Sequence, residues 1–143
     1  HFIDLCMFLT GSPITNVSAN ALDEANNLLD TVSINLSFAN GSIANIAYFS
    51  NGSKSVNKEY LEVFGAGQVS ILDDFKKLTI SGKKQEELKG TQDKGHQAEV
   101  AAFLQSIKEG KPAPISFEEI YASTHATFKV LESIALSGTK VFI

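Results

Sequence analysis

One segment of this chain alternates strictly between apolar and small polar residues, and this alternation limits what the chain can fold into. The apolar members are Val32, Ile34, Leu36 and Phe38, and the polar members between them are Thr31, Ser33, Asn35 and Ser37. A period of two indicates a strand with one face in a core. Asn40-Gly41 follows, and this dipeptide strongly favours a tight hairpin. The segment therefore predicts antiparallel β-structure.

Helical patterns flank the strand-forming part of the chain. Residues 1–10 are apolar around the whole helix, which predicts burial on every side, and Gly11 followed by Pro13 predicts its end. Helical spacing returns after Asp93 and stops at Gly110. A capping box, Ser116-Phe117-Glu118-Glu119, begins the last helix. The apolar stripe of that helix comprises Phe117, Ile120, Tyr121, Thr124, Phe128, Leu131 and Ala135.

The order of these patterns predicts the fold class. Extended runs are expected at 14–20, 30–39, 42–50, 58–64, 68–73, 77–81 and 85–89, with a last strand over 141–143. A helix, a series of hairpin-connected strands and two further helices predict an α+β fold. We expect an open, mostly antiparallel β-sheet with helices packed on one face. At 143 residues, of which 43% are apolar and 20% charged, the chain is expected to form a single domain over 1–143.

Charge and composition exclude several functional classes. The chain has 12 lysines, no arginine and 16 acidic residues, for a net charge of −4. An acidic chain without guanidinium groups disfavours nucleic-acid binding. The longest apolar stretch, residues 2–9, is too short to span a membrane. One cysteine, Cys6, cannot form an internal disulfide, so we expect it to be a small buried residue of a protein in a reducing compartment, the cytoplasm.

Histidines are the candidate catalytic residues. On a helix, His1 shares a face with Asp4, and a carboxylate beside an imidazole can tune a general base. The competing interpretation is a structural His–Asp contact within a packed helix. His125 is expected to be a structural helix residue, and His96 a capping or surface residue. No motif with metal-ligand spacing accompanies them, so a metal site is disfavoured.

Two other features carry competing interpretations. Gly65-Ala66-Gly67 superficially resembles a dinucleotide fingerprint, but the residues after it continue as a strand, so a turn between two strands is predicted. The polar face of residues 31–37 is small and uncharged where a solvated sheet usually carries Lys and Glu. This favours contact with another subunit or with a polar ligand such as a sugar; an ordinary exposed Ser/Thr-rich face is equally compatible.

His1-Phe2-Ile3-Asp4-Leu5, followed by Phe8-Leu9-Thr10-Gly11, resembles the H-x-I-D-L-x-x-x-L-x-G segment of the Gfo/Idh/MocA oxidoreductases. The later segments 93–100, 110–112 and 114–119 follow in the family's order, so the resemblance covers essentially the whole chain. The whole chain thus resembles the C-terminal domain of that family.

The resemblance implies a function. An N-terminal Rossmann domain, absent from this chain, would bind most of an NAD or NADP cofactor, and this chain would supply substrate contacts and a homo-oligomer interface through its sheet face. His1 would be the acid/base at a hydroxyl of a sugar, cyclitol or nucleotide sugar, with Asp4 as an orienting or substrate-side carboxylate. Because His1 lies inside a helical pattern, we expect a piece of a longer chain that is inactive alone. The alternative is a non-catalytic dimerisation or interaction module with a structural histidine.

Overall fold

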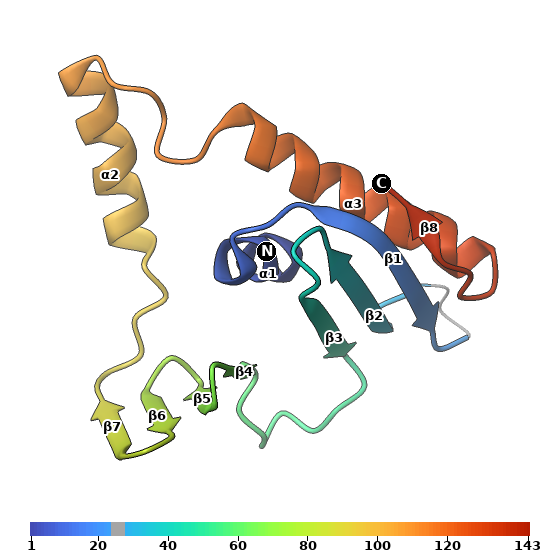
Figure 1. Cartoon of the computed structure of the whole chain (residues 1–143), viewed down its shortest axis with the longest axis horizontal. Helices are drawn as coiled ribbons and strands as arrows, with labels where there is room; N and C mark the ends of the chain where they lie inside the picture. Colours follow the sequence, from blue (N-terminus) through green and yellow to red (C-terminus); the bar gives the residue numbers. More distant parts are fainter. Residues whose placement is uncertain (24–27) are drawn as a thin grey trace. The chain divides into compact units, whose positions relative to one another are not determined.

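The computed structural model describes residues 1–23 and 28–143 and shows an α+β fold, as predicted. The chain forms two compact units: unit 1 comprises 1–51 and 115–143, and unit 2 comprises 52–114 (Figure 1). In chain order the elements are α1 (Phe2–Thr10), β1 (Ile14–Ala21), β2 (Thr31–Phe38), β3 (Ile43–Phe49), β4 (Tyr60–Gly65), β5 (Gln68–Asp73), β6 (Lys77–Ser81), β7 (Gln85–Lys89), α2 (His96–Glu109), α3 (Phe117–Ala135) and β8 (Val141–Phe142).

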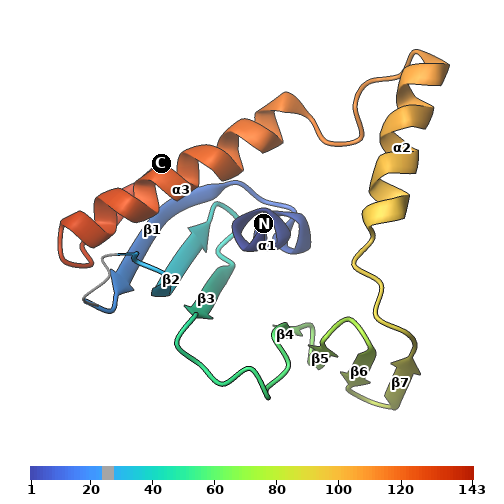
Figure 2. The same ribbon diagram turned by 180° about the vertical axis from the view of Figure 1, so that it is seen from behind.

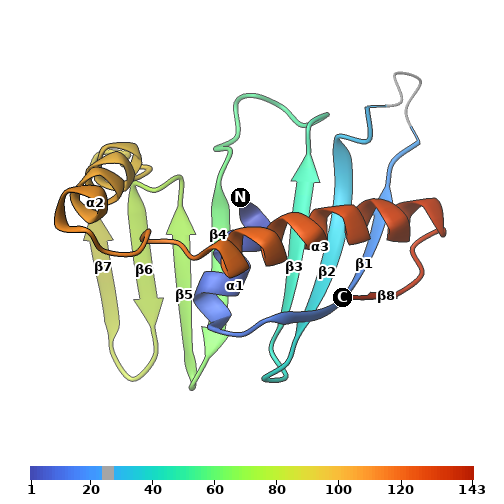
Figure 3. The same ribbon diagram turned by 90° about the horizontal axis from the view of Figure 1, so that it is seen from above.

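Unit 1 contains a four-stranded antiparallel sheet in the order β3-β2-β1-β8, and α3 lies across it (Figure 3). The predicted alternation in β2 is confirmed, because Ile34, Leu36 and Phe38 are buried and Leu36 is only 1% exposed. The β2–β3 connection turns at Gly41, whose φ of 85° lies in the left-handed region that glycine tolerates. The core is a single cluster within this unit: Ile3, Ile14, Val17, Ala19, Ile34, Leu36, Phe38, Ile46, Ala126, Val130 and Val141.

The expectation that the first helix is buried on every side is wrong. Ile3 is buried in the core, whereas Phe8 is 81% exposed and Leu9 is also exposed. One helix face meets the core, and the described chain supplies nothing that covers the opposite face. The predicted end at Gly11 is confirmed: Gly11 is left-handed, and its N–H donates to the carbonyl of Met7.

The apolar stripe of the last helix does not face the sheet. The face of α3 that packs on β1 buries Ala126, Val130 and Ser133, whereas the large members of the stripe, such as Phe117 and Phe128, are exposed. Small residues allow close approach of helix and sheet, so they take the inner face. The capping box at Ser116 and Glu119 is confirmed, with both hydrogen bonds present.

Ser133 links α3 by hydrogen bonds to β1 and to the segment before β8. Its hydroxyl accepts a hydrogen bond from the N–H of Ala19 at 2.9 Å and donates one to the carbonyl of Thr139 at 2.6 Å. The residue is completely buried. A buried hydroxyl with both roles satisfied fixes the helix end against β1 and the approach to β8.

Unit 2 contains a second antiparallel sheet in the order β4-β5-β6-β7, built from consecutive hairpins and followed by α2 (Figure 2). Gly65-Ala66-Gly67 forms the β4–β5 turn, as predicted, with Ala66 and Gly67 at positive φ. Within the described chain, no apolar residue of this unit is buried. The helical stripe of α2, including Phe103 and Ile107, is exposed instead of forming a core.

The strands are divided between two sheets, where the sequence pattern predicts one open sheet. Asn51-Gly52 begins an exposed, polar segment that continues to Lys58 before β4 starts. Turn-forming residues without apolar alternation end the first series of strands. The antiparallel arrangement and the order of elements are as expected.

Candidate functional site

The start of α1 carries both predicted site residues. His1 precedes the helix as its N-cap residue, and its carbonyl accepts a hydrogen bond of 2.9 Å from the N–H of Leu5. His1 is exposed, and Asp4 is partly buried in the first turn. A carboxylate in the first turn interacts favourably with the helix dipole. The geometry therefore presents an accessible imidazole at a fixed helix start.

Two apolar contacts hold this helix start in place. Ile3, directly before Asp4, is buried in the core of unit 1 and anchors the first turn of the helix. The ring of Phe2 lies against that of Tyr48 on β3, with centroids 6.3 Å apart and tilted by 49°. Tilted aromatic pairs at this spacing are favourable beyond their buried area. Sequence analysis missed Tyr48, because its partner is distant in the chain and neither residue belongs to a recognisable motif.

The structure places His1 and Asp4 at the same helix end but does not join them directly. Among the described residues, no hydrogen bond or ion pair connects the imidazole to the Asp4 carboxylate. The direct contact of the structural interpretation is therefore not seen among these residues, and the roles of His1 and Asp4 stay predictions.

The remaining histidines have different surroundings. His96 is the exposed first residue of α2, and Gly95, not His96, is the N-cap. His125 lies within α3, where its ring is 5.7 Å from that of Tyr121, as expected of a structural helix residue. Cys6 is partly buried on α1, and burial raises the pKa of its thiol. In the described part of the chain, no cluster of His, Cys, Asp or Glu could hold a metal ion.

No phosphate cradle is found at the glycine-rich turn. The residues after Gly67 form β5, so no helix N-terminus follows to face a pyrophosphate. The chain also lacks arginine. The residues of this turn therefore do not fit the pyrophosphate of a dinucleotide.

The outward face of the unit 1 sheet is a second candidate surface. In β2, Ser33, Asn35 and Ser37 lie opposite the buried apolar residues, and β1, β2 and β3 contain no charged side chain. Asn45 on β3 donates hydrogen bonds to the carbonyl of Ile34 and to Oδ1 of Asn35, at 3.2 and 3.1 Å. We call these residues the amide face: Asn16, Ser18, Asn20, Ser33, Asn35, Ser37 and Asn45.

The predicted polar run is corrected at one end. Thr31 shares this side of β2 by alternation but is only 7% exposed, so it does not contribute to the exposed amide face. Its hydroxyl is within 3.4 Å of that of Ser50, next to β3. The amide face therefore begins at Ser33 in β2.

Comparison with known proteins identifies the fold through solved structures. No family model matches the sequence, and no curated protein matches it. UDP-N-acetylglucosamine 3-dehydrogenase GnnA from Acidithiobacillus ferrooxidans matches 95% of this chain at 19% identity with a TM-score of 0.84. An oxidoreductase from Agrobacterium radiobacter in complex with NAD⁺, L-tartaric acid and magnesium matches 99% at 13% identity and a TM-score of 0.83. Levoglucosan dehydrogenase in complex with NADH and levoglucosan matches 99% at 17% identity and a TM-score of 0.81.

The match covers only part of those proteins. This chain spans 45% of GnnA, 46% of the Agrobacterium oxidoreductase and 47% of levoglucosan dehydrogenase. Among the described residues, no helix is long and apolar enough to cross a membrane.

Proposed function

This chain has the fold of the C-terminal domain of Gfo/Idh/MocA-type oxidoreductases, and on that premise we propose that it is the substrate-binding and oligomerisation domain of an NAD(P)-dependent oxidoreductase. The substrate class is a sugar, cyclitol or nucleotide sugar that is oxidised at a hydroxyl. One observation carries the proposal. A chain that matches this fold over 95–99% of its length begins α1 with the His1-Phe2-Ile3-Asp4 segment.

His1 is the acid/base in this proposal. Oxidation of a carbinol requires that the hydroxyl proton leave to a base as the carbonyl forms. The exposed imidazole at the start of α1 can accept that proton, and Ile3 and the Phe2–Tyr48 contact hold the backbone that carries it. Asp4, in the same helix turn, orients the imidazole or binds a neighbouring substrate hydroxyl.

The cofactor belongs to a part of the protein outside these residues. NAD or NADP supplies the hydride acceptor when bound. Because this chain lacks arginine and a phosphate-binding turn, we assign the dinucleotide to an N-terminal Rossmann domain of a longer chain. The 143-residue chain alone is then inactive. Its single free thiol, Cys6, suits the reducing cytoplasm.

Replacement of His1 in the longer, cofactor-binding protein tests the assignment. His1→Ala should lower kcat about 100-fold if the imidazole is the general base. His96→Ala is the matched control, because His96 is exposed and belongs to unit 2. Unchanged turnover in a folded His1→Ala protein would favour the non-catalytic interaction module.

The amide face is the proposed homo-oligomer interface. Carboxamides and hydroxyls both donate and accept hydrogen bonds, so a face built from them is complementary to a second copy of itself. The lack of charge on β1, β2 and β3 avoids like-charge repulsion when the two faces meet.

Sedimentation of an amide-face variant tests the interface. We expect the chain to sediment as an oligomer at tens of micromolar, and Asn35→Lys to shift it to monomer because two lysines would then be brought together. Gln85→Lys, on the exposed strand β7, adds the same charge elsewhere and should leave the oligomer unchanged. A monomeric parent chain would rule out this interface.

A further inference from the structure

Unit 2 buries charged carboxylates where unit 1 buries apolar side chains. The side chain of Asp74, in the β5–β6 turn, is only 9% exposed, and that of Glu59, just before β4, is 15% exposed. Buried carboxylates are costly unless they are paired and hydrogen-bonded. The hydrogen-bond and charge partners of Asp74 and Glu59 therefore determine whether these two side chains remain buried.

Asp74 makes hydrogen bonds with three residues. Lys76 Nζ lies 2.5 Å from Asp74 Oδ2, and Gln92 Nε2 donates to Asp74 Oδ1 at 2.9 Å. The Asp74 N–H donates to the carbonyl of Glu59 at 2.8 Å. The hydrogen bond and charge of Lys76 hold the pKa of Asp74 below its ordinary value, with a smaller contribution from the charge of Lys94.

The residues that lead into α2 supply two of these partners. We call residues 90–95 the strap. Gln92 bonds both the carboxylate and the carbonyl of Asp74, and Lys94 Nζ lies 2.8 Å from Glu59 Oε1. Gly90 and Gly95 stand at the two ends of the strap, and Gly95 has a φ of 79°. Apart from backbone bonds, polar side chains connect the strap to the sheet.

Among the described residues, no buried apolar side chain of α2 reinforces the attachment of the strap. The large apolar residues of α2 are all more than half exposed: Val100, Phe103, Leu104 and Ile107. The second carboxylate oxygen of Glu59 is buried and has no hydrogen-bond partner among the described residues. The carboxylate of Glu59 thus relies on Lys94, which belongs to the strap.

We propose that Glu59, Asp74, Lys76, Gln92 and Lys94 form a charged latch that closes the strap onto the β4–β7 sheet, and that opening this latch frees α2 to move while the sheet stays folded. The buried carboxylates belong to the sheet side, and the exposed Gln92 and Lys94 close over them. The glycines at both ends let the strap rotate without strain. This inference does not depend on the proposed enzymatic function.

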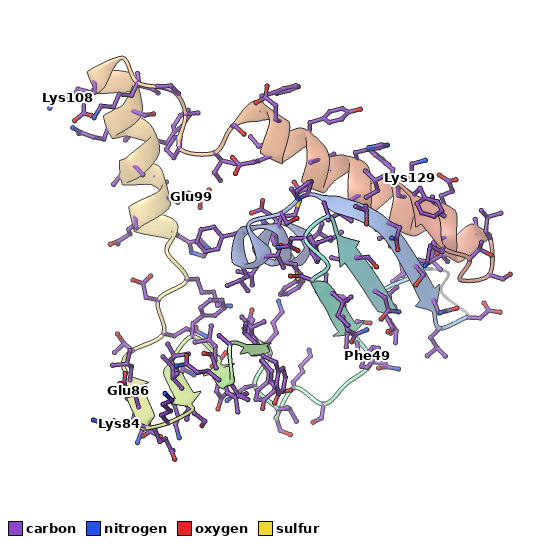
Figure 4. All side chains as sticks on the ribbon, in the orientation of Figure 1. Phe49, Lys84, Glu86, Glu99, Lys108 and Lys129 are labelled. Carbon is purple, nitrogen blue, oxygen red and sulfur yellow. The ribbon has the colours of Figure 1, made fainter. Side chains whose placement is uncertain are left out.

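Hydrogen exchange of the full 143-residue chain, followed by mass spectrometry, tests the latch. Lys94→Met keeps the aliphatic stem and removes the charge. It should raise exchange in the strap and the first turn of α2 about tenfold, the factor expected for losing a hydrogen bond to a charged group. Exchange in β5 and β6 should not change. Lys84→Met is the matched control, because Lys84 lies in the β6–β7 turn and points away from the ribbon (Figure 4).

A double-mutant cycle distinguishes opening of the latch from general unfolding. Glu59→Gln, Lys94→Met and the double variant should all raise strap exchange by a similar factor, because each removes the same ion pair. Gln92→Leu should act like Lys94→Met, because it removes both hydrogen bonds from the strap to Asp74. Strap exchange equal to that of the parent chain in Lys94→Met and Gln92→Leu would overturn the latch. An increase of exchange in β5 and β6 together with that of the strap would also overturn it.

Discussion

The two units of this chain are stabilised by different interactions. Unit 1 encloses every buried apolar residue of the described chain, around β1, β2 and α3, whereas unit 2 buries none and encloses Asp74 instead. Apolar burial tolerates salt and acid, but ion pairs weaken with both. The comparison teaches that a regular strand pattern predicts where a sheet forms and does not predict what stabilises it.

The largest effect should come from opening a cavity in unit 1. Leu36→Ala removes a side chain that is 1% exposed at the centre of the core, and should lower the free energy of unfolding by about 2–5 kcal/mol. Leu88→Ala is the matched change in β7 of unit 2, where the leucine is 64% exposed; it should cost less than about 0.5 kcal/mol. Urea unfolding of both variants measures the difference, and equal losses would contradict the contrast between the units.

A smaller effect should follow from acid, and it should be greater in unit 2 than in unit 1. The pKa of Asp74 lies below its ordinary value of 3.8 because Lys76 stabilises the ionised form. A lowered pKa contributes stability that is present above the ordinary value and is lost as the pH falls through the lowered one. Lys94 and Glu59 are the other charged groups at this site. The protection factor of the strap, which is its exchange rate corrected for the intrinsic rate at each pH, should therefore fall below about pH 4.

Unit 1 supplies the control for the acid experiment. The residues of its core are apolar, so the protection factors of β1 and β2 should change less over the same range of pH. Loss of exchange protection in β2 at low pH, with the protection of the strap unchanged, would contradict the contrast between the two units.

The elements of this fold were predictable from local pattern, and its packing was only partly so. The alternation around Leu36 correctly predicts the buried face of β2, and Ser116 with Glu119 correctly predicts the start of α3. Local periodicity fails where two apolar faces compete. In α3 the small residues Ala126 and Ser133 meet the sheet, while the bulkier stripe around Phe128 is exposed, because close approach favours small side chains.

The candidate site was likewise only partly predictable from the sequence. The H-x-I-D segment predicts His1 and Asp4 as site residues from sequence alone, because its members are close along one helix. Tyr48 and the latch are formed by residues that are distant in sequence, such as Glu59 and Lys94. Contacts of this kind depend on strand register, which a single sequence does not reveal.

Chemical rescue is the most direct test of the central claim that His1 moves the hydroxyl proton. In the longer, cofactor-binding protein, the His1→Ala variant should lose turnover about 100-fold and regain part of it in proportion to added imidazole, because the free base can replace the missing side chain. The His96→Ala control should be insensitive to imidazole. A folded His1→Ala protein with unchanged turnover, or one that imidazole does not rescue, would contradict the assignment.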